Sequence, residues 1–462
     1  MAASQPGQRS TESALPVSHK LLYATGSFGA NVAFQAVAAW LIFFYAPPDG
    51  EGRETLVPIG IVGAILVAGR VIEALDDPLI GYWSDHTRSR WGRRVPFILF
   101  GTPALALTFF LLWTPPVDGE SLWNAAYLFL ALEAFFLLNT VVGGPYDALL
   151  PEIAATSEDR VSLSAWKVLF GAAGAGAVFL LAGPLIDAGG FAAMGLAMAT
   201  AILVSRLVPL LGVRGHLRRE TPGAGMPVRG AIRAALANGP FMAFIPAFVL
   251  FTTAQVMLTQ LLPFYVDVVL GDTTVSLPLG IELDGSGGKV ALLTGLFFLP
   301  LLVSVPIMGR LAARTSKRTV YAWSMLACGL YFPLLFFIGY LPVIPKFAQS
   351  LLLLGLAPPL AGLFVFPQAL LADIIDFDEH LTGERREALY YGMQGTLQKL
   401  GLGLAAALFA LTLALFGKSA EDPLGVRLVG PMAGICTLIG YVVFVRRYRL
   451  SDEGGVLAPA AS

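Results

Sequence analysis

Charge is scarce in this sequence. Asp, Glu, Lys and Arg make up 13% of its 462 residues, while hydrophobic residues make up 56%. Soluble domains contain roughly 45–50% apolar residues, so this chain is too apolar for that class and we expect it to lie in a membrane. The formal net charge of -1 says nothing by itself about partners.

Residues suited to redox or metal chemistry are also few. The two cysteines, Cys328 and Cys436, fall within predicted apolar spans, which argues against a disulfide and against a metal cluster. The four histidines have no metal-ligand spacing and are His19, His86, His216 and His380. No nucleophile–base pair and no phosphate-binding loop is apparent, so we expect a protein that is not an enzyme and has no cofactor.

Long apolar runs are what the sequence does have. A membrane-spanning helix needs about 20 apolar residues, and twelve such windows occur. They begin near residues 20, 56, 96, 122, 161, 192, 241, 289, 320, 347, 389 and 425. The polar N-terminus lacks the features of a signal peptide, so we expect the first helix to direct insertion.

The spans divide into two halves. Residues 213–239 form the longest basic, Gly- and Pro-containing interruption, which we interpret as a linker between two six-helix bundles. The predicted segments are an N-terminal tail, a bundle, the linker, a second bundle and a C-terminal tail, at residues 1–18, 19–212, 213–239, 240–446 and 447–462. The sequence therefore predicts an all-α membrane protein of twelve helices in two pseudosymmetric bundles.

An internal repeat supports this division. "ALLPEI" at 148–153 returns as "ALLADI" at 369–374, each at the end of the fourth span of its half. "GYWSDHTRSRWGRR" after the second span has a weaker echo in "GRLAARTSKRT" at 309–319. Repeats of this size, with the pathway at their interface, are typical of secondary transporters.

Basic residues indicate the orientation. With both termini in the cytoplasm, 22 Lys and Arg fall in inside segments, five in outside segments and three within spans. The positive-inside rule therefore predicts an integral plasma membrane protein with cytoplasmic termini.

The second span carries an unusual group of charges. At about 100° per residue, Arg70, Glu73 and Asp77 lie within about 60° of one another, and Asp76 lies on an adjoining face. Charges in a span face the bundle interior or a water-filled cavity, and paired carboxylates can hold Na⁺ or a proton. The alternative is structural: Arg70 and Glu73 form an ion pair, while Asp76 and Asp77 cap or kink the helix before Pro78.

The stretch "EALDDPLIGYWSDHTRSRWGRRVPF" at 73–97 resembles the signature of the glycoside–pentoside–hexuronide:cation symporters, a melibiose permease-like family of the major facilitator superfamily. "GGPYDALLPEI" at 143–153, "SEDR" at 157–160 and the pattern at 390–399 extend the resemblance. It implies the major facilitator fold and coupling to Na⁺, Li⁺ or H⁺. By the family motif, the cation ligands stand at Glu73, Asp76, Asp77 and Thr140.

The sequence departs from the family pattern at several positions. Glu73 replaces the usual Asp, and Asp76 replaces a neutral residue, which leaves Na⁺ and H⁺ both open as the coupling ion. Asn31 and Gly143 stand where two sugar-binding acids occur in melibiose-type members, and Asp147 stands where those members have a Trp. These departures argue against a galactoside.

Other polar residues in the spans are candidates for substrate binding or coupling. Lys399 matches the family's intramembrane lysine and is expected to face the cavity, with snorkelling to the surface as the alternative. Tyr391, Gln394 and Gln398 could bind substrate hydroxyls or join helices. Together with Asn31 and Arg70, these six residues are our substrate or coupling candidates.

A second basic group suits a cytoplasmic gate. Arg88, Arg90, Arg93 and Arg94 stand beside Asp85, where ion pairs can lock one orientation of a transporter. Simple positive-inside anchoring is the alternative for these arginines.

We therefore predict a monomeric symporter whose partners are a small solute, most plainly a sugar or glycoside, and membrane lipids, without nucleic acid. Two alternatives stay open: transport of an amphipathic solute such as a lysophospholipid, as in vertebrate members of the family, or a sensor or scaffold of the same fold.

Overall fold

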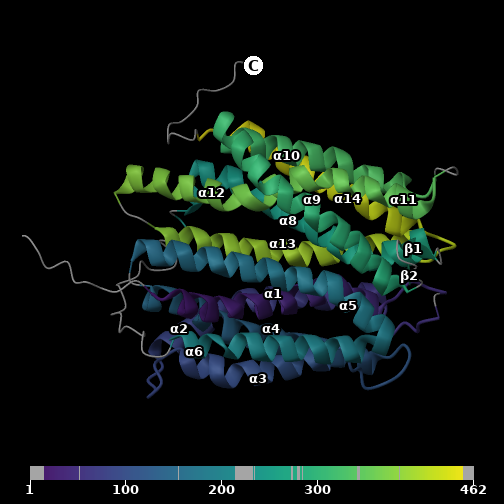
Figure 1. The fold of residues 1–462 in the computed structure, drawn as a ribbon, viewed down its shortest axis with the longest axis horizontal. Coiled ribbons are helices and arrows are strands. Elements are labelled where there is room, and N and C mark those ends of the chain that lie inside the picture. The colour runs from purple at the N-terminus through teal and green to yellow at the C-terminus, as the bar shows by residue number, and fades with distance from the viewer. Residues whose placement is uncertain are drawn as a thin grey trace, which may run out of the picture.

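The structure is a computed structural model that describes residues 15–450, apart from 51, 155, 214–232, 234, 272–273, 278–280, 284, 341–343 and 384–385. Long helices run back and forth through this part of the chain in one bundle (Figure 1). The predicted tails and most of the predicted linker lie outside the described residues, so their boundaries stay predictions.

The first half contains six named helices. They are α1 (Val17–Tyr45), α2 (Ile59–His86), α3 (Val95–Leu111), α4 (Leu122–Ile153), α5 (Ser157–Leu207) and α6 (Pro209–Val213). α5 is interrupted at Gly189 and Gly190, where Gly190 has φ +73°. Lys20 pairs with Asp159 near the start of α5, and the carbonyl of Gly212 bonds His19. Both ends of α5–α6 thus meet the start of α1, so the chain reverses at the two glycines and spans twice.

The second half has a more varied set of elements. They are α8 (Gly239–Tyr265), the π-helix η1 (Val266–Leu270), α9 (Ser286–Arg314), α10 (Lys317–Tyr331), η2 (Phe332–Phe337), α11 (Lys346–Ser350), η3 (Leu351–Leu356), α12 (Ala357–Thr382), α13 (Glu387–Phe416) and α14 (Leu424–Arg447). Two short strands, β1 (Val275–Leu277) and β2 (Ile281–Leu283), form an antiparallel pair with Val275 opposite Leu283. The sequence does not predict this hairpin, because three-residue strands carry too little periodicity to detect.

Each of the twelve predicted spans corresponds to a helical segment. Nine helical stretches among the described residues are long and apolar enough to cross a membrane, and the broken α5 supplies two crossings within one of them. The other two crossings are α2, which carries the charged group, and α3, which is 17 residues long. Observed and predicted starts agree within four residues.

Capping side chains set several helix starts. Ser121, Thr156, Asn238 and Ser316 each accept a hydrogen bond from a backbone N–H in the first turn of the helix that follows. Such caps satisfy donors that have no partner within the helix. These short polar residues therefore mark where the spans begin.

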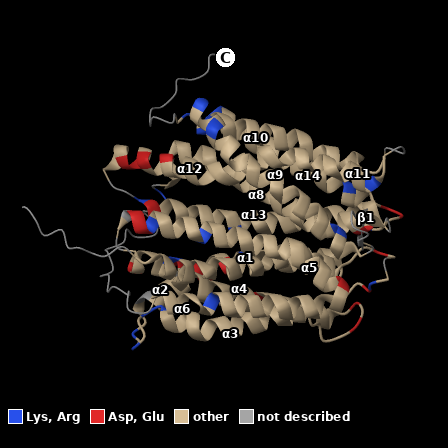
Figure 2. Cartoon of the chain, in the orientation of Figure 1, with Lys and Arg blue, Asp and Glu red and all other residues tan. Residues whose placement is uncertain are grey.

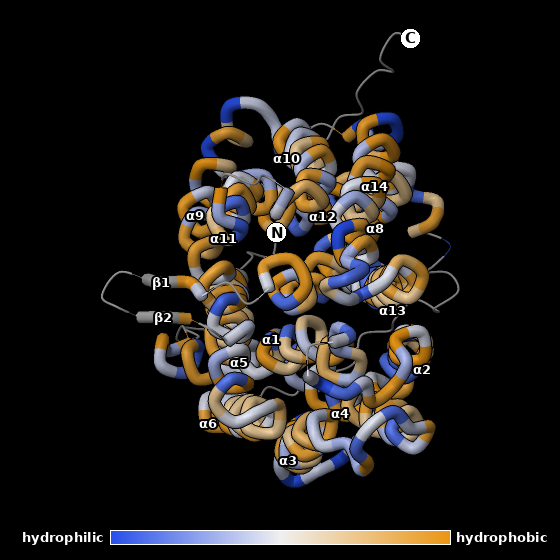
Figure 3. The backbone as a smooth tube through the Cα atoms, turned by 90° about the vertical axis from the view of Figure 1, so that its right-hand side faces the viewer, coloured by the Kyte–Doolittle hydropathy of each residue, from blue (hydrophilic) through white to orange (hydrophobic). Residues whose placement is uncertain are grey.

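The molecule has two distinct ends. The terminal end holds residues 15–20, 87–94, 315–318 and 447–450, and the hairpin end holds β1, β2 and residues 46–58. Charged residues gather mainly at these two ends, with few between them (Figure 2). Seen along the helices, α1–α6 occupy one side of the bundle and α8–α14 the other (Figure 3).

The buried core shows where the halves join. One apolar cluster contains residues of both halves, including Phe43 and Phe264, whose rings meet edge to face at 5.2 Å near the hairpin end. A second cluster contains only residues from 235 to 450. The halves thus share a core toward the hairpin end.

Candidate cation and substrate site

The charges of α2 meet the lysine of α13 at the interface of the halves. The Lys399 ammonium lies 2.5 Å from Asp77 Oδ2 and 3.2 Å from Glu73 Oε1. Arg70 donates to Glu73 Oε2 at 2.7 Å, and Thr140 donates to Asp77 Oδ1 at 3.1 Å. Residues from α2, α4 and α13 thus form one polar cluster, which we call the acidic cluster.

Burial differs sharply between the two paired carboxylates. The side chain of Glu73 is 4% exposed, while that of Asp77 is 35% exposed. The Arg70 guanidinium lies 4.2 Å from the centre of the Phe136 ring, so a cation–π contact accompanies its ion pair with Glu73. Glu73 is therefore the inner carboxylate and Asp77 the more accessible one.

The cluster contains more acid than base. Asp76 is half-buried and has no ion pair among the described residues, and Glu133 of α4 has a buried Oε1 without a hydrogen-bond partner. Glu133 lies against α2, since a Cβ added at Gly69 would be 2.7 Å from Glu133 Oε1. With Glu73 and Asp77, four carboxyl groups accompany two cations, Arg70 and Lys399. An excess of oxygen ligands with negative charge suits Na⁺ or a proton.

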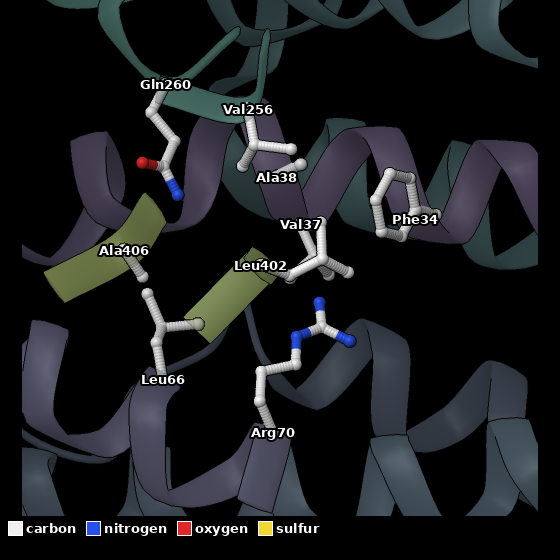
Figure 4. Close-up of a pocket in the computed structure, with 9 residues that line it drawn as sticks. All are labelled: Phe34, Val37, Ala38, Leu66, Arg70, Val256, Gln260, Leu402 and Ala406. Carbon is white, nitrogen blue, oxygen red and sulfur yellow. The ribbon is translucent and has the colours of Figure 1, made fainter. Parts of the chain in front are cut away.

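A small pocket lies beside this cluster, between the halves (Figure 4). Its lining comes from α1, α2, α8 and α13, and consists of Phe34, Val37, Ala38, Leu66, Arg70, Val256, Gln260, Leu402 and Ala406. Arg70 and Gln260 are its polar side chains, and Arg70 also belongs to the acidic cluster. Arg70 stands out in the sequence, but the apolar lining does not, because nothing in a run of alanine, valine and leucine marks a cavity wall.

The remaining substrate candidates lie in varied surroundings. Asn31 donates from Nδ2 to the carbonyl of Ser27 within its own helix at 3.0 Å. Gln394 is buried and its Nε2 has no hydrogen-bond partner among the described residues, Gln398 is half-buried, and Tyr391 is 43% exposed. Their roles stay predictions.

The hairpin end is held shut by polar contacts between the halves. Arg53 pairs with Asp267 at 3.3 Å, and Lys418 with Asp49 at 2.7 Å. Asp187, at the end of the first segment of α5, accepts hydrogen bonds from the backbone N–H groups of Gly287 and Gly288 at 3.2 and 2.8 Å. A carboxylate of one half thus caps the first turn of α9 in the other.

At the terminal end, the predicted gate arginines bond within their own half. Arg93 and Arg94 approach Glu152 Oε1 at 2.7 and 2.8 Å. Arg88 and Arg90 are exposed, and Arg90 stacks on the Trp91 ring at 4.4 Å. The side chain of Asp85 lies outside the described residues. The gate stays a prediction, since in this state these contacts do not cross to the other half.

An equivalent ion pair occurs in the second half. Lys317, at the start of α10, lies 2.5 Å from Asp373 of α12. Glu152 and Asp373 occupy the same place in "ALLPEI" and "ALLADI". The repeat in the sequence thus corresponds to a repeated contact.

Replacing Glu152 with Gln should lower the apparent melting temperature more than replacing Asp373 with Asn. Glu152 is 6% exposed and faces two arginines, while Asp373 is 20% exposed. Removing one partner of a buried pair costs about 3–5 kcal/mol, against roughly 0–1 kcal/mol for a fully exposed pair, and the Asp373 pair lies between these limits. Thermal unfolding of the purified variants measures both melting temperatures. Equal falls in the two variants would contradict the expected dependence on burial.

Comparison with known proteins adds three findings. A model of the family described as MFS/sugar transport protein matches residues 22–451. The isoprimeverose transporter of Lactiplantibacillus pentosus is 24% identical over 426 residues, covering 90% of this chain and 84% of its own. The sodium-dependent lysophosphatidylcholine symporter 1 of Gallus gallus is 30% identical over 167 residues, covering only 36% of this chain and 30% of its own.

Solved structures agree on the fold. The crystal structure of a mutant of the nucleoside transporter NupG superposes with a TM-score of 0.65 at 12% identity, covering 93% of this chain and all of the other. At that identity the likeness concerns the fold alone.

Proposed function

We propose that this chain, which belongs to the MFS/sugar transport protein family and is a cation-coupled transporter of the major facilitator fold, carries a sugar or glycoside together with Na⁺ or H⁺. The observation that carries the proposal is the position of Lys399, which bridges Asp77 and Glu73 from the opposite half. A cation bound there changes the contact that joins α2 to α13. No cofactor is needed besides the coupling ion.

Competition between Lys399 and the cation provides the coupling. Without a bound ion, the ammonium of Lys399 neutralises Asp77 and Glu73. When Na⁺ or a proton binds the carboxylates, the lysine loses its counter-charge and becomes available to a substrate oxygen. Each ligand then favours the arrangement that the other needs, which is the thermodynamic meaning of symport.

The orientation follows from charge. We assign the terminal end to the cytoplasm, because 22 of the 30 Lys and Arg fall on that side in the sequence. The hairpin end, where Asp187 joins the halves, then faces outward and is closed. The proposed carrier is therefore closed to the outside in this state and sits in the plasma membrane, as a monomer of two six-helix bundles.

Uptake into proteoliposomes tests the function. We expect a radiolabelled glycoside to accumulate when an inward Na⁺ or proton gradient is imposed, and to stop accumulating when an ionophore dissipates that gradient. Lysophosphatidylcholine transport is measured in parallel. Accumulation of the lysolipid alone would mean that the substrate is an amphipathic solute and not a sugar. Transport of neither solute would favour a sensor or scaffold.

A further inference from the structure

We propose that Gln260 determines the specificity of the carrier by binding a hydroxyl group on a short arm of the solute, such as a hydroxymethyl group on a sugar ring. The inference rests on the proposed function and adds a specificity-determining residue to it. The arm enters the small pocket between the halves, and the rest of the solute lies on the side of the acidic cluster. Gln260 belongs to α8 and is not part of that cluster.

Gln260 is a buried amide with an unsatisfied acceptor. Its residue is 4% exposed, and its Oε1 has no hydrogen-bond partner among the described residues. The side chain lines the pocket, as does that of Val256 one turn earlier on α8. Buried polar atoms in folded proteins are almost always hydrogen-bonded, because leaving one without a partner is costly. A ligand that brings a donor into the pocket therefore completes a contact that the protein itself leaves open.

The pocket is small and its walls are mostly apolar. Its volume is about 20 Å³, and a cavity needs about 10–15 Å³ to hold one water molecule. It therefore admits one or two groups of that size and not a whole sugar ring. The apolar walls include Val37 and Ala38 of α1, Leu66 of α2 and Leu402 of α13. An arm that fits has an apolar stem and a polar tip.

The polar side chains of the pocket favour a hydroxyl as that tip. Arg70 of α2 and Gln260 of α8 approach the pocket from opposite sides (Figure 4). A guanidinium only donates hydrogen bonds, and an amide oxygen only accepts them. A hydroxyl does both at once, since it accepts from Arg70 and donates to Gln260. A carboxylate has no hydrogen for the amide oxygen, and an ammonium has no lone pair for the guanidinium and is repelled by it.

The position of the pocket links recognition to closure. On α2, Leu66 precedes Arg70 and Glu73, and the helix begins at the hairpin end, so the pocket lies on the hairpin side of the acidic cluster. Arg70 belongs to the first half and Gln260 to the second. A hydroxyl that bonds both residues therefore stabilises the arrangement in which the hairpin end is closed.

Three methyl β-D-glycosides that differ in one arm test the proposal. The glucoside carries a hydroxymethyl group, the 6-deoxyglucoside a methyl group and the xyloside a hydrogen atom. Binding to the full-length purified protein is measured by titration calorimetry, once at saturating Na⁺ and once at low pH. We expect the glucoside to bind about tenfold more tightly than the 6-deoxyglucoside, whose methyl group displaces water without replacing its hydrogen bonds. The xyloside leaves room for a water molecule and should lie between them.

Gln260→Leu removes the amide and keeps a side chain of similar size. It should lower the affinity for the glucoside about tenfold and leave the affinity for the 6-deoxyglucoside unchanged or higher, which also shows that the variant is folded. Gln255→Leu is the matched control. Gln255 lies on the same helix about 140° away from Gln260 and does not line the pocket, so this variant should keep the wild-type order of affinities.

Two results would overturn the inference while sugar binding upholds the proposed function. One is equal affinity of the wild type for the glucoside and the 6-deoxyglucoside, and the other is a preference that survives in Gln260→Leu. If the leucine variant does not fold, Gln260→Asn carries the amide on a shorter side chain and should lose most of the preference, so an unchanged preference there has the same meaning. Binding of none of the three glycosides by the wild type overturns both proposals.

Discussion

Asp77→Asn is expected to abolish gradient-driven accumulation, because a carrier that has lost its coupling only equilibrates the solute, at an accumulation ratio of about one. The substitution keeps the shape and removes the charge that Lys399 contacts at 2.5 Å and Thr140 at 3.1 Å. The Asp77 side chain is 35% exposed, so its ion pair is only partly buried, and the expected loss comes from the missing cation ligand rather than from the pair itself. Asn has no carboxylate for a cation, so coupling is lost.

Two transport assays separate a loss of coupling to the cation from a loss of substrate movement. Uptake under a cation gradient is compared with exchange of labelled for unlabelled substrate without a gradient. We expect exchange to persist in Asp77→Asn, because the pathway between the halves remains. Asp118→Asn, which changes an exposed residue at the hairpin end, serves as the control and should transport normally. Full accumulation by Asp77→Asn would mean that the cation binds elsewhere.

Gly183→Leu is expected to hold the hairpin end open and abolish transport. A Cβ at Gly183 would lie 2.2 Å from the carbonyl oxygen of Gly287, and one at Gly287 would lie 2.1 Å from that of Gly183. Two backbones meet here, so no flexible side chain can move aside. Small residues permit this approach of helices in a membrane, and a leucine would prevent α5 from closing on α9.

A cysteine in place of Ala38 reports this opening. Ala38 lines the pocket between the halves, and the native Cys328 and Cys436 are buried and free. Labelling by a membrane-impermeant maleimide from outside should rise at least about tenfold in Gly183→Leu, as expected when closure loses 1.4 kcal/mol or more. Gly176→Leu in the same helix is the matched control, because a Cβ there meets nothing within 4 Å. Equal labelling in both variants would contradict the proposed closure.

Much of the fold follows from the sequence, because a membrane imposes a length and a polarity on every span. The broken α5 illustrates this: the two windows near 161 and 192 predict two crossings, and Gly189 and Gly190 supply the turn between them. The β1–β2 hairpin was missed because membrane thickness does not constrain segments outside the bilayer.

The candidate site was predictable in part. Charge in an apolar helix is conspicuous, so Arg70, Glu73, Asp77 and Lys399 stood out, and the structure brings all four together. Arg206 is visible as a charge within a span, but nothing in its sequence neighbours indicates that its side chain is buried beside Asn139 and Tyr146. That property depends on which side chains meet between α1, α4 and α5, and long-range packing does not follow from local pattern.

Linkage between cation and sugar is the most direct test of the account. Affinity of the purified protein for the bound glycoside is measured by calorimetry with and without Na⁺ at fixed pH, and again across pH without Na⁺, in the wild type and in Asp77→Asn. We expect Na⁺ or protons to tighten glycoside binding in the wild type, and we expect the affinity of Asp77→Asn to respond to neither. A glycoside affinity that depends on the cation equally in both proteins would contradict a coupling site at Glu73 and Asp77.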